Sequence, residues 1–153
     1  MLRNMTSIYI QHQDEVLMLY RVGSRVIEPS WVGIGGHFEP QEVHDPKACA
    51  LRELQEETGL TENSLEDLVL RYVSLRHNGA GLRQNFYFFA RLRGEKPPLS
   101  CTEGRLRWVK WDKVPDLPMP VTARFCVEHY LRQGRLDHRL YAIIHDAETG
   151  RSV

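Results

Sequence analysis

The sequence predicts one domain of the α/β (α+β) class over residues 1–153, with helices packed on a mixed β-sheet. The main observation is the order of its segments, because β-prone and helix-type runs follow one another as ββ-α-βββ-α-β. The composition agrees with a packed core, since 42% of the residues are hydrophobic and 26% are charged. No internal repeat or Gly/Ser linker divides the chain, and 153 residues suit one ordinary domain.

The first elements expected along the chain form a β-hairpin. Residues 7–11 and 16–20 are apolar, β-prone runs on either side of the polar stretch 12–15. A short apolar piece at 31–34 then enters Gly35–Gly36, where glycine allows unusual backbone dihedral angles.

The first helix is expected over residues 47–58. Asp45 and Pro46 form a favourable start as N-cap and first-turn residues, and Gly59 is suited to end the helix. The remaining expected elements are strands at 68–76, 82–92, 105–111 and 140–145 and a second helix at 120–133.

Charge and cysteine content exclude several classes of protein. The 20 Lys and Arg residues balance 20 Asp and Glu residues, which argues against a general nucleic-acid binder. No apolar run approaches the roughly 20 residues of a membrane-spanning helix, and the N-terminus lacks a secretory signal. The three cysteines form no Cys-x-x-Cys pair, so neither a disulfide framework nor a thiolate zinc site is expected. A cytoplasmic protein without nucleic-acid or membrane partners is the prediction.

Three glutamates of the first predicted helix share one spacing. Glu53, Glu56 and Glu57 stand at i, i+3 and i+4, which places their carboxylates on one face that is expected to be exposed. Like charges at this spacing repel by about 0.2–0.5 kcal/mol per pair, and a bound cation removes that cost. Hard oxygen ligands favour Mg²⁺ or Mn²⁺ over Zn²⁺. The alternative is a solvated acidic face in which Arg52 pairs with Glu56.

The surrounding residues resemble the box that defines the Nudix family. Gly36, Glu42 and the run from Arg52 to Leu60 follow Gly-x5-Glu-x7-Arg-Glu-U-x-Glu-Glu-x-Gly-U, where U is aliphatic. Nine residues separate Glu42 from Arg52 instead of seven, which indicates a two-residue insertion in the loop before the helix. The insertion leaves open whether Glu42 or His44 takes the place of the first glutamate of the box.

The resemblance covers most of residues 6–133, including the segment from Glu103 to Trp108. It implies the Nudix α/β/α sandwich with a central mixed β-sheet. It also implies Mg²⁺-dependent hydrolysis of a nucleoside diphosphate linked to another group, with water attacking phosphorus. Mn²⁺ is the alternative ion.

The resemblance also implies roles for single residues. The expected metal ligands are Gly36, Glu53, Glu56, Glu57 and Glu103. Either a box glutamate or Glu103 would take the proton of the attacking water, while Arg52 would orient the helix glutamates. The candidates for contacts with the substrate are Arg21, Gly35 and His37. For Arg83 and Gln84, a solvent-exposed position is preferred over a place in the cleft.

The substrate is less closely defined than the reaction. The box and the 103–108 segment look like the Nudix branch that hydrolyses oxidised purine triphosphates such as 8-oxo-dGTP. ADP-ribose and other nucleotide sugars are the nearest alternative. A non-catalytic nucleotide-binding module or a metal-free scaffold is a further alternative, but the presence of all three helix glutamates favours an enzyme. The expected partner is a nucleotide small molecule, and the expected state is a monomer or homodimer.

Overall fold

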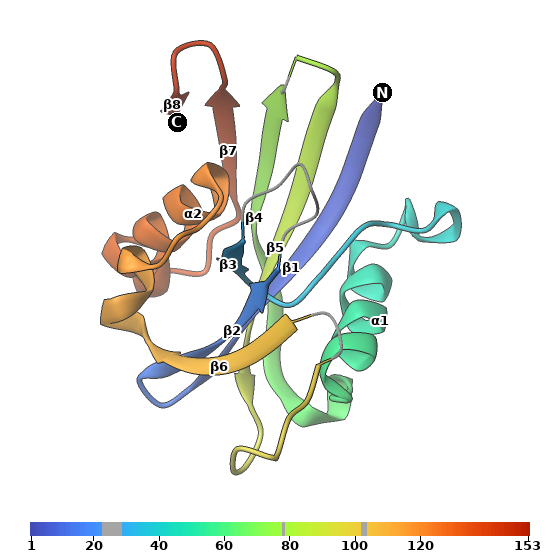
Figure 1. Ribbon diagram of the computed structural model, residues 1–153, viewed down its shortest axis with the longest axis vertical. Coiled ribbons are helices and arrows are strands. Elements are labelled where there is room, and N and C mark those ends of the chain that lie inside the picture. Colours follow the sequence, from blue (N-terminus) through green and yellow to red (C-terminus); the bar gives the residue numbers. More distant parts are fainter. Residues whose placement is uncertain (23–28, 78, 102–103) are drawn as a thin grey trace.

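The computed structural model of the protein describes residues 1–22, 29–77, 79–101 and 104–153. Within these residues the strands form one mixed sheet that curls on itself (Figure 1). The strands are β1 (Leu2–His12), β2 (Glu15–Arg21), β3 (Ser30–Val32), β4 (Leu65–His77), β5 (Leu82–Leu92), β6 (Gly104–Lys110), β7 (Tyr141–Asp146) and β8 (Arg151–Ser152).

The sheet has the order β3-β2-β1-β5-β4-β7-β8, and β6 pairs with β2. The pairs β1–β5 and β4–β7 are parallel, and the other pairs are antiparallel. β2 pairs with β1 only near their shared turn, whereas its whole length pairs with β6. Beyond the turn, β2 therefore separates from β1 and continues beside β6, while β1 stays paired with β5.

One helix covers each face of the sheet: α1 (Pro46–Thr58) lies on one side and α2 (Val121–Arg132) on the other (Figure 1). The alternation along β1 shows the two layers. Ile8 packs in a core cluster with Leu54 of α1, whereas Tyr9 packs in a second cluster with Val127 of α2. The predicted fold class, helices packed on a central mixed sheet, is confirmed.

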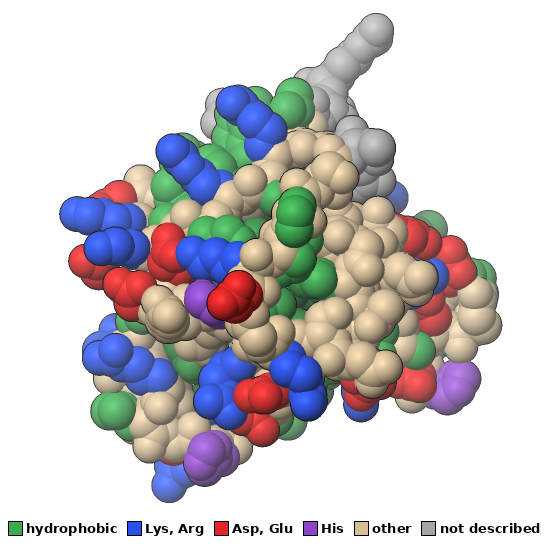
Figure 2. Space-filling view, turned by 90° about the horizontal axis from the view of Figure 1, so that it is seen from below, with side chains coloured by type: hydrophobic (Ala, Val, Ile, Leu, Met, Phe, Trp, Pro, Cys, Tyr) green, Lys and Arg blue, Asp and Glu red, His purple; other side chains and the backbone are tan. Residues whose placement is uncertain are grey.

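Short helical turns complete the connections. They are the 3₁₀ helices η1 (Pro40–Glu42), η2 (Glu62–Ser64), η3 (Trp111–Asp116) and η4 (Gly134–Leu136). Acidic and basic side chains are interspersed on the face shown in Figure 2, in keeping with the balanced charge of the chain. Neither α-helix in the described residues is long and apolar enough to cross a membrane.

The helix α1 starts and stops where the sequence predicts. The Asp45 carboxylate accepts a hydrogen bond of 3.1 Å from the backbone N–H of Ala48. At the other end, Gly59 adopts a left-handed conformation with φ of 77°, and its N–H donates to the Gln55 carbonyl at 2.9 Å. These two signals set the length of the helix and hence the positions of its glutamates.

Asp45→Ala is expected to lower the free energy of unfolding by about 1 kcal/mol, because it removes the acceptor for an N–H of the first turn. Urea denaturation followed by circular dichroism measures this change. Asp45→Asn keeps an acceptor at the same position and serves as the matched control. Equal losses in the two variants would contradict the role of Asp45 as a cap.

Candidate active site

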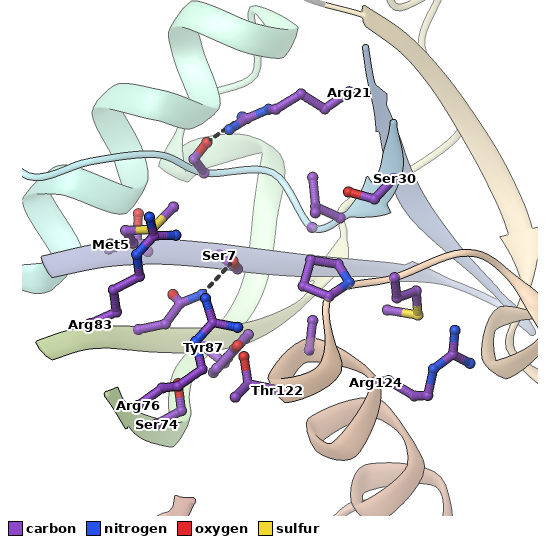
Figure 3. Close-up of a pocket in the computed structure, with 18 of the residues that line it drawn as sticks. Met5, Ser7, Arg21, Ser30, Ser74, Arg76, Arg83, Tyr87, Thr122 and Arg124 are labelled. Atoms are coloured by element: carbon purple, nitrogen blue, oxygen red, sulfur yellow. Dashed lines mark hydrogen bonds between the residues drawn. The ribbon is translucent and has the colours of Figure 1, made fainter. Parts of the chain in front are cut away.

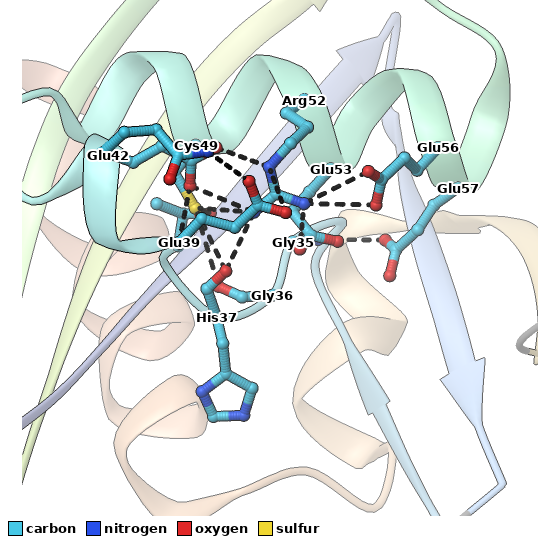
Figure 4. Close-up of polar contacts among 12 residues, drawn as sticks. Gly35, Gly36, His37, Glu39, Glu42, Cys49, Arg52, Glu53, Glu56 and Glu57 are labelled. Carbon is cyan, nitrogen blue, oxygen red and sulfur yellow. Dashed lines mark hydrogen bonds and ion pairs between the residues drawn. The ribbon is translucent and has the colours of Figure 1, made fainter.

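The three glutamates of α1 face the same side of the helix, as predicted, but they differ in burial (Figure 4). The side chain of Glu56 is 57% exposed, whereas Glu57 is only 3% exposed. The expectation of an exposed carboxylate is therefore wrong for Glu57. Burial follows from the segment before α1, since the Gly35 N–H donates to Glu57 Oε2 at 3.1 Å. A Cβ at Gly35 would lie 1.9 Å from the Thr6 carbonyl, so glycine permits this close approach to β1.

Arg21 connects the end of β2 to the buried Glu57. Its Nη2 donates to Glu57 Oε1 at 2.8 Å and to the Gly35 carbonyl at 2.9 Å. The Arg21 guanidinium supplies a charged donor to this carboxylate, and the Gly35 N–H supplies a second donor. Two of the predicted substrate-contacting residues, Arg21 and Gly35, thus share one hydrogen-bond network with a predicted metal ligand.

Arg52 donates hydrogen bonds to three carboxylates at once, while its role in orienting the helix glutamates stays a prediction (Figure 4). Its Nη1 donates to Glu53 Oε1 at 3.0 Å and to Glu56 Oε2 at 3.2 Å. The other edge of the guanidinium contacts Glu42 through two bonds, Nε to Oε1 at 2.5 Å and Nη2 to Oε2 at 3.1 Å. Paired, forked contacts of this kind fix the orientation of the guanidinium.

The structure decides the position that the two-residue insertion leaves open. Glu42 is 7% exposed and pairs with Arg52, whereas His44 lies at the surface. The three residues up to Glu42 form η1, and the Glu39 N–H donates to Glu42 Oε2 at 3.0 Å. Glu42 therefore keeps its contact with the box arginine despite the longer loop.

The ion pair changes the acidity of both partners. Hydrogen bonds from Arg52 lower the pKa of Glu42 from its ordinary value of 4.5 to about 2. The same contact with Glu42 raises the pKa of Arg52. Both groups are consequently charged across the whole neutral range.

Glu42→Gln is expected to lower the free energy of unfolding at pH 7 by about 1–3 kcal/mol, because the charged acceptor for Arg52 is lost. The pKa of Glu42 is depressed on folding, so its stabilisation is complete above the unfolded pKa and disappears as pH falls towards 2. The gap between wild type and variant should therefore close between about pH 5 and pH 2. Denaturation curves over this pH range measure it.

Glu62→Gln is the control for this variant, because the side chain of Glu62 is 54% exposed in a surface pair with Lys47. A pH-independent gap between Glu42→Gln and wild type would contradict the assignment of the acid transition to Glu42.

Gly36 lies directly beneath the Glu53 carboxylate. A Cβ at position 36 would fall 2.5 Å from Glu53 Oε1 and 2.8 Å from Oε2, so only glycine leaves room for this carboxylate. The Gly36 carbonyl, a predicted metal ligand, accepts a hydrogen bond of 2.9 Å from the Thr6 N–H. That bond uses one of the two lone pairs of the oxygen.

His37 is less closely associated with the glutamates than its neighbours are. Its carbonyl accepts a hydrogen bond from Arg52 at 3.0 Å, but its imidazole points away from the glutamates (Figure 4). Partial burial and the charges of Arg3, Arg83 and Arg21 lower the pKa of His37, so the ring is neutral at pH 7.

A cleft of about 510 Å³ opens beside the network of Arg21 and Gly35, which both line it (Figure 3). Arg83 and Gln84 also line the cleft, so the preferred expectation of solvent-exposed positions is wrong for both. Other polar lining residues that the sequence analysis did not single out are Ser7, Ser74, Arg76, Asn85, Thr122 and Arg124. Ser7, Ser74, Arg76 and Asn85 lie on the strands β1, β4 and β5, and Thr122 and Arg124 lie on α2. The sequence of a strand does not show which of its faces borders a cleft.

The donors at this site suit a hard divalent cation. They are carboxylates and backbone carbonyls, and glycine at position 36 leaves space for the Glu53 carboxylate. As they stand, no three acidic, histidine or cysteine side chains of the described residues converge as a metal-ligating group. The carboxylates are instead held by Arg52 and Arg21. Glu103, the remaining predicted ligand, lies outside the described residues.

Comparison with known proteins identifies the family. The family model for the NUDIX domain matches residues 1–129. The fold resembles the mutator MutT protein of Bacillus halodurans, with 23% identity, a TM-score of 0.68 and coverage of 99% of this chain and 94% of that one. It also resembles a NUDIX hydrolase of Nitrosomonas europaea, with 19% identity, a TM-score of 0.69 and coverage of 92% and 93%.

A third similar structure is an Ap4A hydrolase of C. elegans, with 16% identity, a TM-score of 0.67 and coverage of 86% of this chain and 95% of that one. At these sequence identities, the similarity to solved structures establishes only the fold. The family membership rests on the match to the family model. The chain therefore belongs to the Nudix family of pyrophosphohydrolases, enzymes that cleave a nucleoside diphosphate linked to another group.

Proposed function

We propose that this protein is a Mg²⁺-dependent pyrophosphohydrolase that cleaves a nucleoside triphosphate or a related nucleoside diphosphate derivative, with Mn²⁺ as the alternative ion. The observation that carries the proposal is the network of Arg21, Gly35 and Glu57, because it joins the glutamates of α1 to the cleft. A substrate in the cleft would thus have its diphosphate beside these carboxylates.

Each residue at the site has a distinct part in this proposal. Glu53, Glu56 and Glu57 would hold the cation, and Arg52 would keep their carboxylates in position. The ion supplies Lewis-acid polarisation of phosphate oxygens and lowers the pKa of a bound water. Arg21 is placed to exchange its contact with Glu57 for a forked contact with a phosphate. Most of the acceleration then comes from positioning and from charge stabilisation during in-line attack at phosphorus.

A carboxylate must accept the proton of the attacking water. The candidates are a box glutamate of α1 and Glu103. A rate–pH profile of kcat for Glu103→Gln distinguishes them, because only loss of the accepting group removes the acidic limb of the profile. An unchanged profile in this variant assigns the proton to a helix glutamate.

The proposed substrate is an oxidised purine triphosphate such as 8-oxo-dGTP, with nucleotide sugars such as ADP-ribose as the second candidate. Similar folds include proteins named as MutT and as an Ap4A hydrolase, so both triphosphates and longer nucleotide polyphosphates belong in the test. The size of the cleft, about 510 Å³, is within the usual range for a small-molecule site.

The experiment is a substrate panel with Mg²⁺ and with Mn²⁺. It contains normal and oxidised dNTPs, ADP-ribose and dinucleoside polyphosphates, and the products are identified by ion-exchange chromatography. We expect hydrolysis of at least one triphosphate to a monophosphate and pyrophosphate, and complete loss of turnover in EDTA. Metal-independent turnover would contradict the role of the cation.

A non-catalytic nucleotide-binding module would give a different result in the same panel. Such a protein would bind nucleotide in the presence of Mg²⁺, as measured by calorimetry, without forming any product. A metal-free scaffold would bind neither nucleotide nor Mg²⁺ nor Mn²⁺. The three measurements together therefore separate the enzyme from both alternatives.

A further inference from the structure

The sheet carries a row of arginines that the proposed reaction does not use, and two of them, Arg76 and Arg83, line the cleft. In the strand pairing, Arg3 of β1 is the partner of Arg83 of β5, and Arg83 is in turn the partner of Arg76 of β4. Three cationic side chains therefore lie side by side across three neighbouring strands. We call Arg3, Arg83 and Arg76 the arginine row.

The row belongs to the face of the sheet that borders the cleft. Tyr72 and Tyr87, which pack against α2, are separated from Arg76 and Arg83 by even numbers of residues along their strands. Arg76 and Arg83 both line the cleft, and Figure 3 shows their side chains on the same side of the sheet as Thr122 of α2. The guanidinium groups therefore face the space in which a substrate would lie.

The other cleft arginines have partners within the protein. Arg21 pairs with Glu57, and Arg124 donates to the carbonyls of Pro115 and Leu117. In contrast, no member of the arginine row forms an ion pair with a carboxylate of the described residues. The Nε of Arg83 is buried without a hydrogen-bond partner there.

Such an arrangement is unfavourable without an anion. Like charges directly opposite each other in a sheet are destabilising. Burial and the neighbouring Arg83 lower the pKa of Arg76, which reflects this repulsion. A phosphate between the guanidinium groups of Arg76 and Arg83 would offset the repulsion. It would also supply acceptors for several N–H groups, including the buried Nε of Arg83.

We propose that Arg76 and Arg83, extended by Arg3, bind a second phosphate of the substrate, separate from the diphosphate that is hydrolysed. Among the nucleotides of the proposed function, this favours nucleoside diphosphate derivatives with an additional phosphate on the ribose over an unmodified triphosphate. This inference rests on the proposed function for the orientation of the substrate, since the glutamates of α1 would take the scissile diphosphate.

The test uses ligands that a pyrophosphohydrolase cannot cleave. Adenosine 5′-monophosphate is compared with adenosine 2′,5′-bisphosphate and 3′,5′-bisphosphate, and the guanosine series is measured in the same way. None of these compounds contains a phosphoric anhydride, so titration calorimetry in Mg²⁺ measures binding alone. We expect at least one bisphosphate to bind about tenfold or more tightly than its monophosphate, as for a well-placed charged contact.

Substitutions in the arginine row test whether these residues cause the preference for bisphosphates. In Arg76→Gln and Arg83→Gln the ratio of bisphosphate to monophosphate affinity should fall several-fold, and in the double variant it should approach one. Arg91→Gln is the matched control, because Arg91 also lies on β5 but is 61% exposed and pairs with Asp67. This control should keep the full ratio. Since the variants relieve repulsion, their melting temperatures should not fall below that of the wild type.

Two results would overturn the inference. One is equal binding, or no binding, of every monophosphate and bisphosphate by the wild-type protein. The other is a preference that survives in the double variant. A protein that hydrolyses no diphosphate in the substrate panel, but that shows the expected ratios, would refute the proposed function and leave the phosphate site supported.

Discussion

Glu57→Gln is expected to lower kcat by about 10²–10⁴-fold, the largest effect of any single change at the site. Glu57 is the most buried of the three helix glutamates, and it alone contacts both Arg21 and Gly35. The amide keeps the shape of the side chain but loses the charge that a cation and Arg21 require. Steady-state kinetics on the best substrate of the panel measures the loss.

The same variant should show a moderate loss of stability. Its pair with Arg21 is broken, but the Arg21 side chain is 34% exposed and can be solvated, so we expect a cost of about 1–3 kcal/mol. The rise of melting temperature with Mg²⁺ should shrink, because binding to the folded state is weaker. Glu128→Gln, a change at an exposed glutamate of α2, is the control. Near-normal turnover of Glu57→Gln in a folded protein would remove Glu57 from the proposed machinery.

The helix that carries these glutamates was predictable because its signals are local. Asp45 as N-cap and Gly59 as C-cap act within a few residues of themselves, so their effect does not depend on the rest of the fold. The spacing of Glu53, Glu56 and Glu57 then places them on one side by helix geometry alone. The presence of a β-sheet was predictable for a similar reason, since short apolar, β-prone runs indicate strands from the local sequence alone.

The surroundings of the helix were not predictable in this way. Burial of Glu57 results from the approach of Gly35 to β1, a contact between segments distant in sequence. Glu42 meets Arg52 across the longer loop that separates them, and no spacing rule describes that geometry. The arginine row needs the register of β1, β5 and β4, and a shift of one residue would move those side chains to the other face.

Gly36→Ala is expected to reduce activity by about 10–100-fold, the effect typical of displacing a metal ligand through its support. The φ angle of Gly36 lies outside the left-handed region, so the backbone accommodates alanine without strain. Alanine also restricts the unfolded chain, which by itself favours folding. The nearest conflict is with the carboxylate, because the added Cβ would lie 2.5 Å from Glu53 Oε1. The expected result is therefore an enzyme that remains folded but whose Glu53 carboxylate is displaced.

Two comparisons make the cause of that loss measurable. If Gly36→Ala acts through Glu53, then adding it to Glu53→Gln should cost much less than it costs alone, because interacting residues give non-additive effects. Glu53→Asp shortens the side chain, so the double variant Gly36→Ala/Glu53→Asp should recover part of the Mg²⁺ affinity measured by calorimetry. Fully additive losses, with no recovery, would show that position 36 acts on catalysis independently of Glu53. The carbonyl of Gly36 would then be the group to pursue; it accepts from the Thr6 N–H at 2.9 Å and, at 4.0 Å, from the Cys49 thiol, a weak donor that a cation could displace.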